Sequence, residues 1–143
     1  MSEIKGDIKR VMVFGVFDRL HPGHLDFFRQ AAQHGDELIA VVARDRMVEE
    51  LKNKSPFHSE VERLAMVQNV SEVTLAILGD EAQGSYGVIA AHKPDVICVG
   101  YDQYRLAEDL QIYIRKDKFV SFGIKMLEPY GPKIFHTSIL AEK

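Results

Sequence analysis

The sequence has no tryptophan and only one cysteine among its 143 residues. Cys98 has no second thiol with which to form a disulfide or a zinc site, and its place in the apolar run VICVG predicts a buried, unreactive side chain. No apolar run approaches the roughly 20 residues that span a bilayer, and the polar start MSEIKGDIKR lacks the apolar core of a signal peptide. These absences predict a cytoplasmic protein without a membrane segment.

Basic charge is not in excess either, because the net charge is −3. A general basic surface is therefore excluded, and with it nucleic acid or an anionic membrane as an expected partner. The length and the 46% hydrophobic content are sufficient for one domain with a hydrophobic core. We expect a polar N-terminal extension at residues 1–10 and a single domain at 11–143.

Strand-like and helix-like segments alternate along this domain. Strands are expected at 11–17, 38–43, 73–78, 96–99 and 124–127, and helices at 22–33, 45–54, 59–69, 86–91 and 106–118. Gly35 is a candidate C-cap, and Leu25 is expected on the buried face of the first helix. The alternation predicts an α/β fold: a Rossmann-like, doubly wound parallel sheet of about five strands. Ligands of such sheets bind beyond the carboxyl ends of the strands, where the strand order reverses.

The segment VMVFGVFDRLHPGHL contains the pattern that is most informative about function. It leads from an apolar strand through a turn into a helix, with Pro22 suited to the first turn and Gly23 leaving the backbone open to a ligand. The free N–H groups and the dipole of a helix N-terminus attract anions. His21 and His24 are three residues apart, so both imidazoles can point at one phosphate there. Alternatively, they cap the helix or face solvent.

GVFD followed by HPGH resembles the GxFD and HxGH signatures of the cytidylyltransferase-like nucleotidyltransferases. These enzymes join a nucleoside monophosphate to a phosphorylated acceptor and release pyrophosphate. The resemblance implies that His21 and His24 are catalytic and stabilise the pentacoordinate α-phosphate, as positioned charge does in phosphoryl transfer. It also implies a nucleotide site that includes Gly15, Val16, Phe17, Asp18, Pro22 and Gly23.

The segment LKNKSPFHSEVER by itself is typical of an exposed charged loop. It is similar to the loop after the second strand of glycerol-3-phosphate cytidylyltransferases, in which lysines and a [YF]HS-x3-R pattern reach the triphosphate and the acceptor phosphate. The resemblance implies catalytic roles for Lys52 and Lys54, without a choice between them, and a phosphate contact for Arg63. We expect this loop to be poorly ordered until ligand binds and the site closes.

GYDQ and the tail segment KIFHTSIL supply further polar side chains. Asp102 and Gln103 follow the fourth strand, where they either form a polar turn or bind nucleotide; Asp102 can accept from ribose or base, or hold Mg²⁺ through water. We expect Mg²⁺ to be carried by the triphosphate rather than by direct protein ligands. KIFHTSIL resembles the family's closing ISTT or FHSS motif, which implies phosphate contacts for Thr137 and Ser138. Otherwise these residues cap a last helix.

Longer matches resemble one branch, the archaeal-type FAD synthases: VARDRMVEELKNKSP, ERLAMV, LGD, KPDVICVGYDQ and KIFHTS. This resemblance implies Mg²⁺-dependent transfer of AMP from ATP to FMN, and the dimer common in the family is expected on the same ground alone. A flavin ring needs an apolar or aromatic wall. The aromatic residues in or beside the expected loops are Phe57, Tyr101, Tyr104, Tyr130 and Phe135, although loop aromatics often pack on the core.

Three features depart from relatives. Ser71 stands where relatives often carry a basic residue, the tail has no arginine at the position used by the cytidylyl enzymes, and the paired cysteines near the FHSS motif are absent. Two alternatives therefore stay open. One is a cytidylyltransferase that uses CTP and glycerol 3-phosphate or a similar small phosphorylated alcohol. The other is a nucleotide-binding regulator with the same pocket and no turnover.

Overall fold

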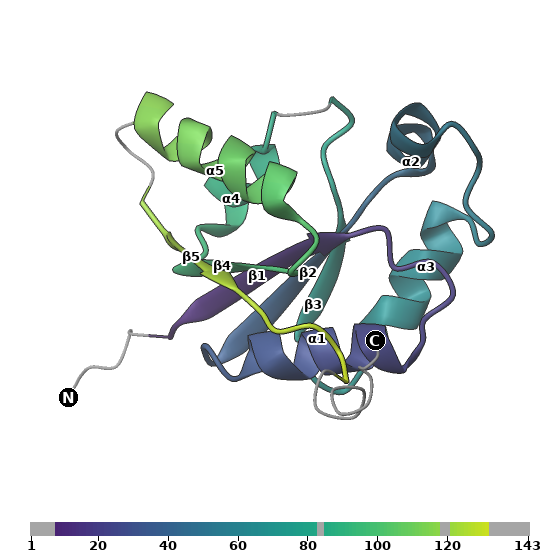
Figure 1. Cartoon of the computed structure of the whole chain (residues 1–143), viewed down its shortest axis with the longest axis horizontal. Coiled ribbons are helices and arrows are strands. Elements are labelled where there is room, and N and C mark those ends of the chain that lie inside the picture. Colours follow the sequence, from purple (N-terminus) through teal and green to yellow (C-terminus); the bar gives the residue numbers. More distant parts are fainter. Residues whose placement is uncertain (1–7, 83–84, 118–120, 132–143) are drawn as a thin grey trace, which may run out of the picture.

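Five parallel strands form one sheet in the computed structural model, which describes residues 8–82, 85–117 and 121–131 (Figure 1). The strands are β1 (Arg10–Gly15), β2 (Glu37–Val42), β3 (Leu75–Leu78), β4 (Val96–Val99) and β5 (Gly123–Met126), in the order β3-β2-β1-β4-β5. The chain builds outward from β1 to β3 and then crosses back to β4, so the order reverses between β1 and β4. The α/β prediction of about five parallel strands is confirmed.

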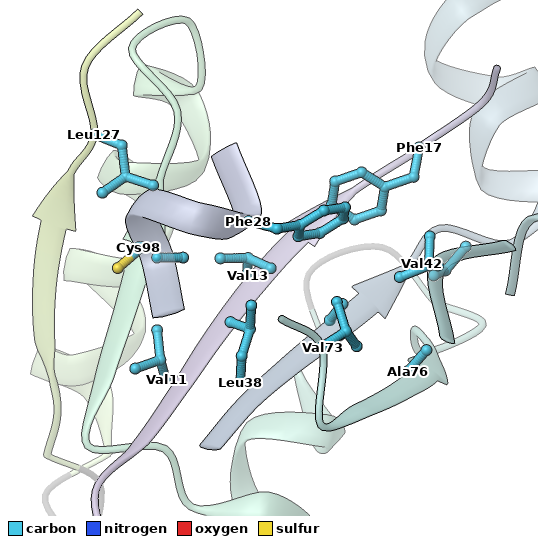
Figure 2. Close-up of a cluster of buried hydrophobic side chains, with 13 residues drawn as sticks. Val11, Val13, Phe17, Phe28, Leu38, Val42, Val73, Ala76, Cys98 and Leu127 are labelled. Carbon is cyan, nitrogen blue, oxygen red and sulfur yellow. The ribbon is translucent and has the colours of Figure 1, made fainter. Parts of the chain in front are cut away.

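Helices cover both faces of the sheet. They are α1 (Pro22–Ala32), α2 (Asp45–Lys52), α3 (Glu60–Gln68), α4 (Gly87–His92) and α5 (Tyr104–Lys116). On one face Val11 and Val13 pack with Phe28 of α1, as Figure 2 shows, and Val67 of α3 belongs to the same cluster. On the other face Met12 packs with residues of α4 and α5. Successive residues of β1 point to opposite faces and both faces are buried, which explains why its sequence is continuously apolar.

Several boundaries differ from the sequence-based expectation. β1 ends at Gly15, because Phe17 has a left-handed backbone (φ 53°) that turns the chain out of the sheet. α1 is capped at Gln33 rather than at Gly35, and a Cβ on Gly35 would lie 2.7 Å from the carbonyl oxygen of Lys9. The expectation of a Gly35 cap was wrong; this glycine permits a close backbone approach instead.

Two further helix predictions are corrected. Leu25, expected in the core, is 46% exposed on α1. The α2 helix ends at Lys52 rather than at residue 54, because Asn53 takes the left-handed conformation that commonly closes a helix. Lys52 therefore belongs to α2 and Lys54 does not. Of the helices in the described parts of the chain, none is long and apolar enough to cross a membrane.

Candidate active site

The turn after β1 depends on an unusual fit between Gly15 and Phe17. Phe17 folds back so far that a Cβ on Gly15 would lie 2.5 Å from its ring. The ring is buried and packs against Phe28, with 4.9 Å between ring centroids, and against the edge of His24. Gly15 and Phe17 therefore shape the turn that presents the histidines, and their direct contact with a nucleotide stays a prediction.

His21 and His24 form the capping box of α1. Nδ1 of His21 accepts a hydrogen bond from the backbone N–H of Gly23 at 3.1 Å, and Nδ1 of His24 accepts from the N–H of His21 at 3.3 Å. Their rings stack with centroids 3.9 Å apart. Gly23 is required here, because a Cβ would lie 2.9 Å from the His21 ring. Capping and catalysis are compatible: with Nδ1 accepting, each neutral ring carries its proton on Nε2 and can donate it to a ligand.

Burial lowers the pKa of His24 to about 4, with further lowering from the charges of His21 and Lys52, while Asp18 opposes the shift. His24 is therefore neutral at neutral pH, in agreement with its accepting hydrogen bond. The effect of Lys52 also indicates that the end of α2 is near the histidines. Lys54 makes no such contribution, although both lysines are exposed. The charge of Lys52, the last residue of α2, is thus felt at His24, and Lys54 lies two residues after the helix end.

Asp18 connects the histidine turn to residues 53–58, here called the lysine segment. Its carboxylate accepts hydrogen bonds from the backbone N–H groups of Phe57 at 2.5 Å and His58 at 3.0 Å. Burial alone would raise the pKa of Asp18, but these bonds from His58 and Phe57 bring it below its ordinary value. Its side chain is thus already used within the protein, and nucleotide contact by Asp18 stays a prediction.

Arg63 has no exposed surface, and all three nitrogens of its guanidinium donate hydrogen bonds to neighbouring loops. It donates to the carbonyl oxygens of His58 at 3.0 Å, Val16 at 2.9 Å and Ala43 at 2.7 Å, and to the carboxylate of Asp45 at 2.7 Å. The expected phosphate contact does not match this placement. Arg63 instead fixes the carboxyl ends of β1 and β2 and the end of the lysine segment relative to one another.

The loop after β4 is tied to β1 by Gln103. Its amide accepts from the N–H of Gly100 at 2.8 Å and donates to the carbonyl oxygen of Phe14 at 2.9 Å, which bridges the strands where their order reverses. Asp102 is exposed in the same turn. The remaining nucleotide-binding candidates, Thr137 and Ser138, and the aromatic Phe135 lie outside the described residues.

A cavity of about 690 Å³ lies at the carboxyl ends of β1 and β2, and the sequence analysis did not single out the residues that line it. Its apolar lining comes from the strand end at Phe14, from Met47 and Leu51 of α2, and from Tyr86 and Leu106. Phe14 and Tyr86 meet edge to face with ring centroids 6.0 Å apart. Met47 and Leu51 are four residues apart on α2, whose remaining apolar residue, Val48, is buried in the core, and this spacing is a sequence signal of the wall.

Of the expected aromatic residues, the four in the described part of the chain do not line this cavity. Phe57, Tyr101, Tyr104 and Tyr130 are all more than half exposed, so they do not pack on the core either. Phe57 lies under the guanidinium of Arg19, which is 3.9 Å from its ring centroid. The aromatic wall of the cavity is supplied instead by Phe14 and Tyr86.

The family model described as cytidylyltransferase-like matches residues 12–142. The chain is 40% identical to the FAD synthase of Aciduliprofundum boonei, over 85% of this chain and 80% of that protein. It is 37% identical to the FAD synthase of Methanothrix thermoacetophila, over 98% and 96% of the two chains.

Among solved structures, the chain is similar to a lipopolysaccharide core biosynthesis protein from Thermoplasma volcanium. The TM-score is 0.79 at 37% identity, covering 86% of this chain and 98% of that one. A pantoate-β-alanine ligase from Francisella tularensis shares the fold alone, with a TM-score of 0.56 at 13% identity over 87% of this chain and 60% of that one. With the paired histidines at the start of α1 and a family match over most of its length, the chain belongs to the cytidylyltransferase-like family.

Proposed function

We propose that this protein is an FMN adenylyltransferase, which transfers AMP from ATP to FMN and releases FAD and pyrophosphate. The main support for the proposal is that the last turn of α2 both lines the cavity and acts on the histidine pair. Leu51 lines the cavity, while the charge of the adjacent Lys52 acts on His24. An acceptor with a phosphate at one end and a large apolar ring at the other fits across this turn. The relatives named FAD synthase support the same choice.

In the proposed reaction, an oxygen of the FMN phosphate attacks the α-phosphorus of ATP, and the bond to the pyrophosphate oxygen breaks. The α-phosphate lies at the N-terminus of α1, where Nε2–H of His21 and of His24 donate to its non-bridging oxygens. Negative charge on these oxygens is stabilised in the pentacoordinate transition state. Because both rings are already fixed by the capping box, the donors need no rearrangement during the reaction.

The acceptor phosphate is held by Lys52, and Lys54 acts on the leaving pyrophosphate from the lysine segment. Mg²⁺ bound to the triphosphate would neutralise part of its charge, and the exposed carboxylate of Asp102 fits an outer contact to that ion through water. Gly15, Val16, Phe17, Asp18, Pro22, Gly23 and Gln103 form the surrounding nucleotide site, and the hydroxyls of Thr137 and Ser138 complete it. Arg63 acts indirectly, by holding the loops in register.

The cavity separates this reaction from the small-acceptor alternative. Glycerol 3-phosphate needs only a small polar pocket, whereas about 690 Å³ with an apolar wall falls within the 300–1,000 Å³ range of sites for drug-sized ligands. The absence of a basic residue at Ser71 and of the tail arginine favours the other alternative, a nucleotide-binding regulator without turnover. We also propose that the protein forms a homodimer, on the ground of its family membership alone.

Product mass after incubation tests the proposal. The protein is incubated with Mg²⁺, FMN and either ATP or CTP, and separately with glycerol 3-phosphate and CTP. We expect FAD from FMN and ATP, and the double variant His21→Ala/His24→Ala serves as the control. CDP-glycerol without any flavin dinucleotide would favour the cytidylyltransferase reaction. Thermal stabilisation by nucleotides without any product would favour the regulator.

A further inference from the structure

The polar side chains that line the cavity fall into two groups. The first group builds the wall and is already hydrogen-bonded. Nε of Arg44 donates to the carbonyl oxygen of Gly79 at 2.8 Å, and the carboxylate of Asp80 accepts from the backbone N–H groups of Gly87 and, at 3.2 Å, Val88. Together they join the end of β3 to the start of α2 and the start of α4.

The second group lies on the α4 and α5 side of the cavity, and its charged side chains are not used in hydrogen bonds that build the wall. Arg105, Glu108 and Asp109 of α5 line the cavity, and none of them forms a hydrogen bond or ion pair with the described residues. Arg105 and Asp109 are one helical turn apart. Tyr86 lies on the same wall. Burial raises the pKa of Tyr86 to about 12, with a further contribution from the charge of Asp109, so the phenol stays protonated and lies near that carboxylate. The wall thus offers donors from Arg105 and Tyr86 and carboxylate acceptors from Glu108 and Asp109, of which Asp109 is the one whose charge acts on Tyr86.

We propose that Arg105, Asp109 and Tyr86 recognise the pyrimidine edge of the flavin ring, an inference that rests on the proposed function. This edge presents two carbonyl oxygens that flank an N3–H group. Two donors and one acceptor are its complement, with Asp109 accepting from N3–H and Arg105 and Tyr86 donating to the carbonyls. The ring faces contact the apolar side chains of Phe14 and Leu51. A small phosphorylated alcohol has no such edge, so these residues determine acceptor specificity.

The test compares FMN with N3-methyl-FMN, which cannot donate from N3. Binding is measured by titration of flavin fluorescence without ATP, and KM is measured by FAD formation. We expect the wild-type protein to bind N3-methyl-FMN at least about tenfold more weakly than FMN, as for loss of a hydrogen bond to a charged group. Asp109→Ala should bind FMN about tenfold more weakly and should no longer distinguish the two flavins. The loss should appear as a higher KM for FMN.

Arg115→Ala on the same helix is the matched control, because Arg115 is exposed and does not line the cavity. It should discriminate between the flavins as the wild-type protein does. Equal affinity of the wild-type protein for both flavins, or unchanged discrimination by Asp109→Ala, would overturn the edge assignment while FAD synthesis persists. Absence of FAD from wild-type protein would overturn the proposed function and this assignment with it.

Discussion

The N-termini of α1 and α3 have the same backbone arrangement and opposite electrostatics. Each has a reciprocal capping box, made by His21 and His24 in α1 and by Ser59 and Glu62 in α3. The first turn of α3 carries the carboxylates of Glu60 and Glu62, whereas that of α1 carries no acidic residue. Since a helix N-terminus attracts negative charge, α3 satisfies this attraction internally and α1 leaves it for a ligand.

This difference shows how a common structural device becomes a functional one. Ser59 and Glu62 use their hydrogen-bonding groups to close the helix end. An imidazole has two ring nitrogens, so His21 and His24 can cap the helix through Nδ1 and still present Nε2–H outward.

The largest effect is expected from Arg63, which connects the start of α3 to the turn before α1. Arg63→Met would leave the Asp45 carboxylate and three carbonyl oxygens without their donor. We expect a loss of about 3 kcal/mol in the free energy of unfolding, measured by urea denaturation. Arg115→Met is the control, because that side chain is exposed. A similar small loss in both variants would show that Arg63 does not hold the loops together.

The second prediction sets the two caps against each other. His21→Ala and Ser59→Ala each remove an N-cap side chain and should each cost about 1 kcal/mol of stability. Only His21→Ala, together with His24→Ala, should lower turnover by roughly 10² or more, because each removes a preorganised donor. Steady-state kinetics and thermal unfolding measure the two effects. Near-normal turnover in both histidine variants would show that the capping box of α1, like that of α3, only stabilises its helix.

The third prediction distinguishes the two lysines. Lys52 acts on His24 and Lys54 does not, so Lys52→Ala should lower kcat/KM on the order of tenfold, and Lys54→Ala should lower it less. Both side chains are exposed, so unfolding should change little in either variant. Amide exchange in residues 53–58 should slow when ATP and FMN bind, as expected if the segment closes over the site. Unchanged kinetics in the double variant Lys52→Ala/Lys54→Ala would show that the lysine segment is a surface loop without a role in the reaction.

The smallest effect concerns the pH dependence of stability. Below pH 6.5 the unfolded chain binds a proton at His24 that the folded chain takes up only near pH 4, so acid favours unfolding across this window. After allowance for solvent screening, the contribution present above pH 6.5 is on the order of 1 kcal/mol. Comparison of unfolding free energies at pH 7 and pH 4.5 should show a smaller drop for His24→Gln than for wild type. An equal drop in unfolding free energy for the two proteins would show that the protonation of His24 does not cause the loss of stability in acid.

The order of elements could be predicted from the sequence because four of the five strands in the described residues are short, mainly apolar runs, β5 with Lys125 being the exception. β4 has the bounds expected for it, and the Ser59–Glu62 pattern predicted the start of α3. The histidine cluster was also predictable, since residues three apart on one helix end must meet. These features depend on local spacing alone.

What could not be predicted depends on contacts between distant segments. The sequence does not show that the ring of Phe17 lies over Gly15, or that Arg63 bonds to carbonyl oxygens from three loops. The cavity is formed by strand ends and helices that are far apart in the chain, so its aromatic residues could not be chosen from a set of loop candidates. Phe14 was assigned to the buried strand and Tyr86 to a helix, and neither stood out.

The central position of β1 has a consequence for how the chain folds. Val11 is paired with Leu38 of β2 on one side and with Val96 of β4 on the other. About 80 residues separate β1 from β4, which corresponds to roughly 4 to 16 s of synthesis. During this interval one edge of the earliest strand has no hydrogen-bonding partner, and unpaired apolar edges promote association between chains. Nascent chains that end before Val96 should therefore aggregate, whereas chains that extend past β4 can complete the sheet.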